Sequence, residues 1–249
     1  MHRSSRLTRF LAPVVGVICL ATAALATSVP AGAQPTTTVD TTPTTAPAPV
    51  AAPTTLALTG PDLAKGSSGA EVWLLQARLI ERGFWLSDYP GVFGENTRHA
   101  VVAYQKFHGL PRTGRVDALT RFHIGGTADR ALPSRGNAGH TIEVDIRRQV
   151  LIVATGGRTD WVFDISSGKA STRTPVGSFR IQRQINGLRR SALGTLWRPK
   201  YFTGGYALHG SPSVPAYAAS HGCVRMTNAE IDYLWASGLA NVGTPVTLY

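Results

Sequence analysis

Two different spacings of apolar residues divide the chain after residue 61. Between residues 62 and 124, apolar side chains recur every three or four positions, as Val72, Leu75 and Leu79 do, and this spacing predicts amphipathic helices. Gly83 is expected to end the first helix. Asn96 is expected to cap the second, which should stop at Gly109. A shorter third helix around 118–122 would complete a small bundle.

From His140 onward the apolar spacing changes to two, which is the period of a half-buried strand. The predicted strands span 141–146, 150–153, 161–166, 179–182, 206–208 and 246–249. Short strands joined by turns rich in Gly and Pro indicate a mainly antiparallel sandwich or barrel. One helix interrupts them, because Thr227 and Glu230 form a capping-box pattern ahead of the apolar residues Ile231 and Leu234.

The N-terminal part of the chain has the pattern of an export signal followed by a tether. Three arginines precede an apolar run and small residues in 1–33, which is typical of a secretory signal peptide. An uncleaved membrane anchor is the alternative, since the apolar run is close to the shortest that spans a bilayer. Residues 34–61 are rich in Pro and Thr and predict a disordered linker. Residues 125–139 form a second, shorter linker before 140–249.

Composition narrows the surroundings in which the protein works. The formal net charge is +11, of which the signal peptide supplies three Arg and no acid. A basic exported protein suits polyanionic surroundings such as a bacterial wall. Nucleic acid is the usual rival partner, but the export signal and the lack of a helix dense in Lys or Arg argue against it.

Cysteine usage points to thiol chemistry. The chain has two cysteines, and Cys19 falls within the signal peptide, so the mature protein keeps Cys223 with no partner for a disulfide. Cys223 lies in the segment Ser-His-Gly-Cys-Val-Arg, and His209 precedes it by fourteen residues. An imidazole beside a thiol can take its proton and leave a nucleophilic thiolate. A zinc site formed by His209, His221 and Cys223, or an inert buried thiol, are the alternatives.

The helical segment resembles the peptidoglycan-binding domain type 1 over about sixty residues. The resemblance is distributed along the chain, and the matching positions are Gly66, Gly69, Val72, Leu75, Gln76, Leu79, Gly83, Phe93, Gly94, Thr97, Ala100, Val101, Tyr104, Gln105, Gly109, Leu110, Gly114 and Val116. It implies that residues 62–124 anchor the protein to the cell wall, without assigning the residues that do so.

The segment from His140 to Tyr249 resembles the catalytic domain of the L,D-transpeptidase family, also called the YkuD domain. His209-Gly210 and the run from Ser220 to Arg225 match the family signature, and the segments 174–179 and 242–246 support it. The resemblance implies that Cys223 is the nucleophile, that His209 exchanges protons with it, and that the carbonyl of Gly210 orients His209. It also implies that the backbone amides around Cys223, including those of His221 and Gly222, stabilise an oxyanion. The residues expected to bind substrate are Tyr201, Ser220 and Arg225.

The fold expected from both resemblances is α+β: a three-helix peptidoglycan-binding domain followed by a mainly antiparallel β-sandwich catalytic domain. The implied reaction is 3→3 cross-linking of peptidoglycan through a Cys223 thioester. A stem tetrapeptide would be the donor and a diamino-acid amine the acceptor. The same thioester could instead serve hydrolysis, as in an L,D-carboxypeptidase, or the attachment of proteins to peptidoglycan. A non-catalytic wall-binding protein is the alternative from another class.

The family implies covalent inhibition by carbapenems and no cofactor or metal. We expect a monomer exported to the periplasm or cell wall, retained at the membrane if the N-terminal segment is not cleaved.

Overall fold

The computed structural model describes residues 58–126, 129–135, 139–191 and 193–249. The predicted signal peptide and nearly all of the predicted Pro/Thr-rich linker lie outside these residues. No helix within the described ranges has the length and apolar character needed to cross a membrane.

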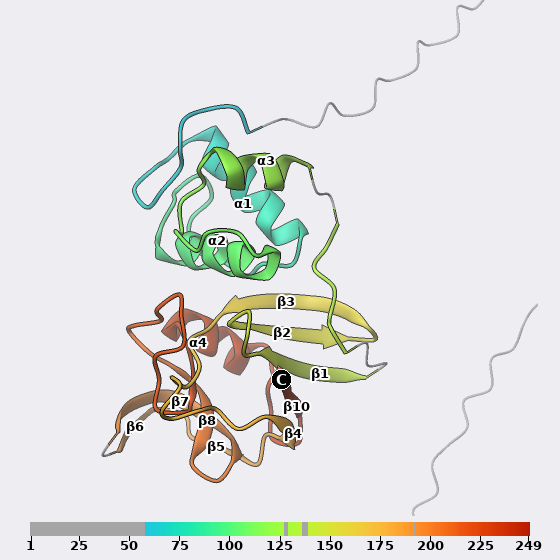
Figure 1. Cartoon of the computed structure of the whole chain (residues 1–249), viewed down its shortest axis with the longest axis vertical. Coiled ribbons are helices and arrows are strands. Elements are labelled where there is room, and N and C mark those ends of the chain that lie inside the picture. Colours follow the sequence, from blue (N-terminus) through green and yellow to red (C-terminus); the bar gives the residue numbers. More distant parts are fainter. Residues whose placement is uncertain (1–57, 127–128, 136–138, 192) are drawn as a thin grey trace, which may run out of the picture. The chain divides into compact units, whose positions relative to one another are not determined.

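The first part of the described chain is helical, as the spacing of its apolar residues predicts (Figure 1). Its helices are α1 (Ala70–Glu81), α2 (Glu95–His108) and α3 (Ala118–Gly126). Leu75, Leu79 and Tyr104 are fully buried between them, and the ring of Phe84 meets that of Tyr104 edge-on at 5.2 Å. Gly109 ends α2 in the left-handed conformation, with φ of 71°, as predicted.

The prediction that Asn96 caps α2 is wrong. The helix begins at Glu95 with Gly94 at the cap position, so Asn96 lies inside the first turn. Asp88, from the preceding loop, supplies the capping oxygen instead. Its Oδ2 accepts a hydrogen bond of 2.6 Å from the backbone amide of Thr97. A carboxylate from another segment therefore does what a cap residue in sequence usually does, and this cannot be read from local pattern.

The second part of the described chain is built from strands and one helix (Figure 1). One sheet has the order β3-β2-β1-β10-β4, and the other has β5-β7-β8-β9 with β6 paired to β7. The strands are β1 (His140–Asp145), β2 (Val150–Thr155), β3 (Arg158–Asp164), β4 (Gly177–Arg180), β5 (Arg183–Gln184), β6 (Leu188–Ser191), β7 (Gly194–Thr203), β8 (Tyr206–Gly210), β9 (Val224–Met226) and β10 (Pro245–Leu248).

Most strand pairs are antiparallel, which confirms the predicted α+β fold. The pairs β1–β10 and β8–β9 are parallel. Helix α4 (Asn228–Ala236) begins with the predicted capping box, in which the side chains of Thr227 and Glu230 each accept a hydrogen bond from the other residue's amide. Strands β5, β6, β7 and β9 were not predicted.

The helical and β parts pack directly on each other, in addition to being joined by the segment 125–139. Every residue from Val150 to Ala154 in β2 is buried, so this strand has apolar neighbours on both faces. Val150 and Ile152 belong to the core that the helices form, whereas Leu151 and Val153 belong to the core between the sheets. Strand β2 therefore contributes side chains to both hydrophobic cores and joins the helical and β parts into one packed unit.

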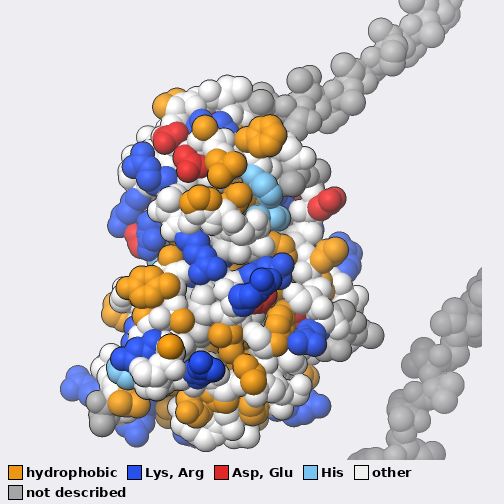
Figure 2. All heavy atoms as spheres, in the orientation of Figure 1, with side chains coloured by type: hydrophobic (Ala, Val, Ile, Leu, Met, Phe, Trp, Pro, Cys, Tyr) orange, Lys and Arg blue, Asp and Glu red, His pale blue; other side chains and the backbone are white. Residues whose placement is uncertain are grey.

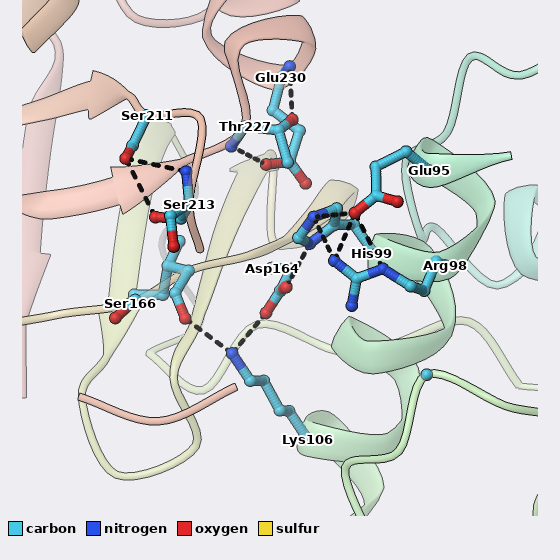
Figure 3. Close-up of polar contacts among 12 residues, drawn as sticks. Glu95, Arg98, His99, Lys106, Asp164, Ser166, Ser211, Ser213, Thr227 and Glu230 are labelled. Atoms are coloured by element: carbon cyan, nitrogen blue, oxygen red, sulfur yellow. Dashed lines mark hydrogen bonds and ion pairs between the residues drawn. The ribbon is translucent and has the colours of Figure 1, made fainter. Parts of the chain in front are cut away.

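A buried group of charges lies at this contact (Figure 3). Lys106 of α2 forms an ion pair with Asp164 at the end of β3, and both side chains are fully buried. The ammonium also donates a 2.7 Å hydrogen bond to the carbonyl of Ile165, and Nδ1 of His99 lies 2.6 Å from the second oxygen of Asp164. These bonds fix α2 to the strand that continues toward the site described next.

Candidate active site

The second sheet has two different faces, and the site lies on one of them. Phe202, Leu208, Val224 and Met226 point into the core between the sheets. On the opposite face, Leu196, Tyr201 and Ala207 form a small apolar group with Ile185 and Cys223 packed against it. Because side chains alternate along a strand, one face holds the fold together and the other is left to form a cavity.

That cavity has a volume of about 630 Å³, and both Cys223 and His209 line it. His209 lies near the end of β8. Arg225 pairs with it in the parallel register between β8 and β9, and Cys223 comes just before β9. The sequence prediction that the histidine and the thiol share a site agrees with this arrangement. Ser220, His221, Arg225 and Tyr201 also line the cavity.

His209 is held in one orientation by its own neighbour. Its ring is buried, and Nδ1 lies 2.9 Å from the carbonyl oxygen of Gly210. Because a carbonyl can only accept, Nδ1 carries the proton, and Nε2 is left with the free lone pair. The pKa of His209 is lowered to about 4, chiefly by burial; the bond to Gly210 opposes this shift, and the charge of Arg225 adds a smaller lowering. The imidazole is thus neutral at pH 7.

The thiol of Cys223 is also neutral at rest. Burial raises its pKa, and this outweighs the opposing effects of the Ala207 backbone and the Arg225 charge. Its Sγ lies 3.7 Å from the carbonyl oxygen of Gly205. The sequence suggested a preformed thiolate–imidazolium pair, whereas the environment favours an uncharged thiol beside an uncharged base. The proton would then move as the sulfur attacks.

The loop before Cys223 is fixed by hydroxyl groups. Ser220 donates to the carbonyl of Cys223 and accepts from the amide of Gly222, and its own amide donates to the carbonyl of Ser167. Thr172 and Thr174 bind the carbonyls of Ser220 and Gly222 at 2.9 and 2.8 Å. Ser220 therefore stabilises the conformation of the loop that it belongs to.

Gly222 has a conformation that requires glycine. Its φ is +115°, and an added Cβ would lie 2.5 Å from the ring of Tyr206. Its amide is occupied by the Ser220 hydroxyl at 3.0 Å, so it is not available to an oxyanion in this conformation. Among the described residues, nothing binds the amides of His221 and Cys223.

Two arginines of the cavity were missed at the level of sequence. Arg183 of β5 and Arg189 of β6 line it together with Arg225. These strands are too short and exposed to show a clear alternation. A usable signal was present, because the chain has no acidic residue between Asp164 and Glu230. As for the zinc alternative, the described residues include no group of three or more His, Cys, Asp or Glu arranged to hold a metal ion.

Comparison with known proteins agrees with both parts of this description. Residues 139–248 match the family model of the YkuD L,D-transpeptidase catalytic domain. Residues 68–122 match the model described as "Putative peptidoglycan binding domain".

One solved structure resembles nearly all of the described chain. It is the crystal structure of the L,D-transpeptidase (residues 123–326) from Xylanimonas cellulosilytica DSM 15894, with 39% identity and a TM-score of 0.71. The match covers 77% of this chain and 98% of that one. The chain therefore belongs to the YkuD L,D-transpeptidase family.

A curated relative matches over a short stretch. This is a "Probable N-acetylmuramoyl-L-alanine amidase" from Bacillus licheniformis, which is 46% identical over 54 residues. The match covers 21% of this chain and only 15% of the length of that protein.

Proposed function

We propose that the protein is an L,D-transpeptidase that forms 3→3 cross-links in peptidoglycan, with Cys223 as its nucleophile. The observation that carries the proposal is the pairing, in one cavity, of the free thiol of Cys223 with a His209 whose Nδ1 is tied to Gly210. A neutral imidazole held this way can accept a proton only at Nε2, which is the requirement for a general base.

In the first half-reaction, the thiol proton moves to Nε2 of His209 as the sulfur attacks the carbonyl carbon of the third residue of a stem tetrapeptide. A C–S bond forms and the carbonyl oxygen takes the negative charge. We assign the amides of His221 and Cys223 to this oxyanion, because the Gly222 amide is already bound to Ser220. The C–N bond then breaks, and the terminal D-alanine leaves with the proton from His209.

In the second half-reaction, the side-chain amine of another stem's diamino acid attacks the thioester. His209 takes a proton from that amine, the new amide bond forms, and the C–S bond breaks. The proton returns to the sulfur, so the enzyme regains its starting state. The energy of the original amide bond is kept in the thioester, and the exchange needs no further reactant.

We assign wall binding to the helical part, in keeping with its family match, and an extracytoplasmic location to the whole protein. Its packing on β2 and β3 would hold the catalytic cavity at a constant position relative to the bound glycan. Cys223 is expected to be acylated by carbapenems through the same attack on a carbonyl.

The test is whole-protein mass spectrometry after incubation with a carbapenem, with Cys223→Ala beside the parent. We expect one adduct on the parent and none on the variant. Incubation with a stem tetrapeptide then separates the outcomes of the thioester: a cross-linked dimer supports transpeptidation, whereas free tripeptide alone indicates a carboxypeptidase. A folded parent with a reduced thiol and no adduct of either kind would overturn the proposal and leave wall binding as the function.

A further inference from the structure

The segment that builds the cavity is basic throughout. Between Asp164 and Glu230 the chain has nine Lys and Arg and no Asp or Glu. The two carboxylates that flank this segment are buried elsewhere. Asp164 is bound to Lys106 and His99, and Glu230 accepts a 2.7 Å hydrogen bond from the amide of Thr227. Neither of them lines the cavity.

Three guanidinium groups line the cavity, those of Arg183, Arg189 and Arg225. Within the described ranges, no Asp or Glu lines it with them, and none of the three forms an ion pair with a carboxylate. Like charges that share one cavity repel each other, and an anion that enters it relieves this repulsion. Figure 2 shows blue Lys and Arg side chains over the region where Figure 1 draws β6 and β7, with the red carboxylates of that face further up.

Arg183 is oriented in advance by an aromatic ring. It pairs with Tyr201 in the register of β5 and β7, and its guanidinium carbon lies 3.5 Å from the centre of the Tyr201 ring. Tyr201 itself is only 5% exposed, so the platform is rigid. A stacked guanidinium loses little freedom when it binds, and its planar donors match the two oxygens of a carboxylate.

The strand order places Arg225 and Arg183 on opposite sides of β8, the strand that carries His209. Tyr201 pairs with Ala207, and His209 lies two residues further along β8 on the same face. Arg225 is on the neighbouring strand β9, while Arg183 is two strands away on the other side, at about 10 Å by strand spacing. An extended peptide with its scissile carbonyl at Cys223 would pass these arginines with the groups that flank the scissile bond.

We infer that the cavity selects acyl donors that carry free carboxylates beside the scissile bond, and that Arg183 and Arg189 are specificity-determining residues that bind such a carboxylate. This inference rests on the proposed function, and it adds which acyl donors the enzyme prefers. Stem peptides can present a given carboxyl group either as the free acid or as the carboxamide. The acid would be the preferred donor here, because a carboxamide offers no charge and only one acceptor oxygen to a guanidinium.

The experiment compares two tetrapeptide donors that are identical except that one non-terminal carboxylate is a carboxamide in the second. The acylation kcat/KM of Cys223 is measured for both donors on the parent, Arg183→Met, Arg189→Met and Arg190→Met. Arg190 is the matched control, because it is exposed on β6 beside Arg189 without lining the cavity. All four proteins should melt at nearly the same temperature, since the substituted side chains are exposed.

We expect the parent to prefer the carboxylate donor by about tenfold or more, which is the range of one charged hydrogen-bonded pair. Arg183→Met should remove most of this preference by slowing the carboxylate donor alone, and Arg190→Met should keep it. Equal rates for the two donors on the parent, or equal losses in Arg183→Met and Arg190→Met, would overturn the inference. If neither donor acylates any of the proteins while iodoacetamide still alkylates Cys223, the proposed function itself fails and the selectivity fails with it.

Discussion

Two groups of charged residues in this protein differ in how their charges are balanced. At the contact between the helical and β parts, Lys106, Asp164 and His99 are buried, and Asp164 binds both of the others (Figure 3). In the catalytic cavity, Arg183, Arg189 and Arg225 have no carboxylate partner within the described part of the chain. Burial without a partner would be costly at the first place, whereas solvent tolerates unpaired charge at the second.

The charges of the first group stabilise the fold, whereas the charges of the second group are available to bind a ligand. The first group can be replaced only together, because each member compensates another. The second group can be changed one residue at a time with little effect on folding, and its effect should appear in substrate choice. Both statements can be tested on the same protein.

The largest expected effect is on stability at the contact. Lys106→Met leaves the fully buried carboxylate of Asp164 without its cation, which should lower the free energy of unfolding by about 3–5 kcal/mol. For a domain of this size the melting temperature should fall by roughly 10 °C. Thermal unfolding followed by circular dichroism measures this.

The matched comparison is Arg183→Met, which should change the melting temperature by no more than about 2 °C. The double variant Lys106→Met/Asp164→Leu should recover part of the loss, because it removes both charges. Equal melting temperatures for Lys106→Met and Arg183→Met would show that the buried pair does not stabilise the contact.

Salt should weaken the interactions of the exposed cavity arginines more than those of the buried charges at the contact. Between about 0.01 M and about 1 M salt, the screening length falls from about 30 Å to about 3 Å. The kcat/KM for a carboxylate donor should fall by roughly threefold to tenfold over this range, since the cavity arginines are open to solvent. The carboxamide donor is the control and should respond much less. A salt response that is the same for both donors would argue against a role for these charges.

The pH dependence of acylation should follow the neutral state of His209. Because burial lowers the pKa of His209 to about 4, the base form predominates from about pH 5 upward. At pH 5 the rate of Cys223 acylation should therefore still be roughly nine-tenths of its rate at neutral pH. Below pH 5 it should decline with a midpoint near pH 4. A midpoint near 6.5 would mean that the ring is solvated in solution and that burial does not control its proton.

The last effect concerns Glu230, which is buried beside the charged contact. Burial raises its pKa to about 7, with Asp164 adding to the shift and His99 opposing it. A carboxyl with a raised pKa binds its proton more tightly in the folded state. Its contribution to stability is therefore complete below about pH 4.5 and is lost as the pH rises through 7. Glu230→Gln keeps the capping geometry and should remove this slope from melting temperatures measured between pH 5 and 8.

Much of the fold could be predicted from the sequence because it depends on local pattern. The helices of 70–126, the capping box at Thr227 and most strands of the first sheet follow from apolar spacing and cap residues. Strands β5 and β6 could not be predicted, since β6 is exposed along its whole length and β5 has two residues. The docking of α2 depends on Lys106 and Asp164, which are 58 residues apart and come together only in the folded chain.

The site divides in the same way. The run from Ser220 to Arg225 could be found in the sequence because its residues are contiguous and chemically distinctive. The neutral state of the thiol and imidazole could not, because it depends on burial by distant segments. Arg183 and Arg189 could not be placed either, since their approach to Cys223 depends on the register of β5, β6 and β7.

The most direct test of Cys223 as the nucleophile is the mass of the intact protein after incubation with a stem tetrapeptide in the absence of an acceptor. We expect a covalent adduct on the parent equal in mass to the donor without its terminal D-alanine. We expect no adduct on Cys223→Ala, and an adduct that forms much more slowly on His209→Ala. A folded parent with a free thiol that releases D-alanine without ever carrying an adduct, or an adduct that persists on Cys223→Ala, would contradict this role of Cys223.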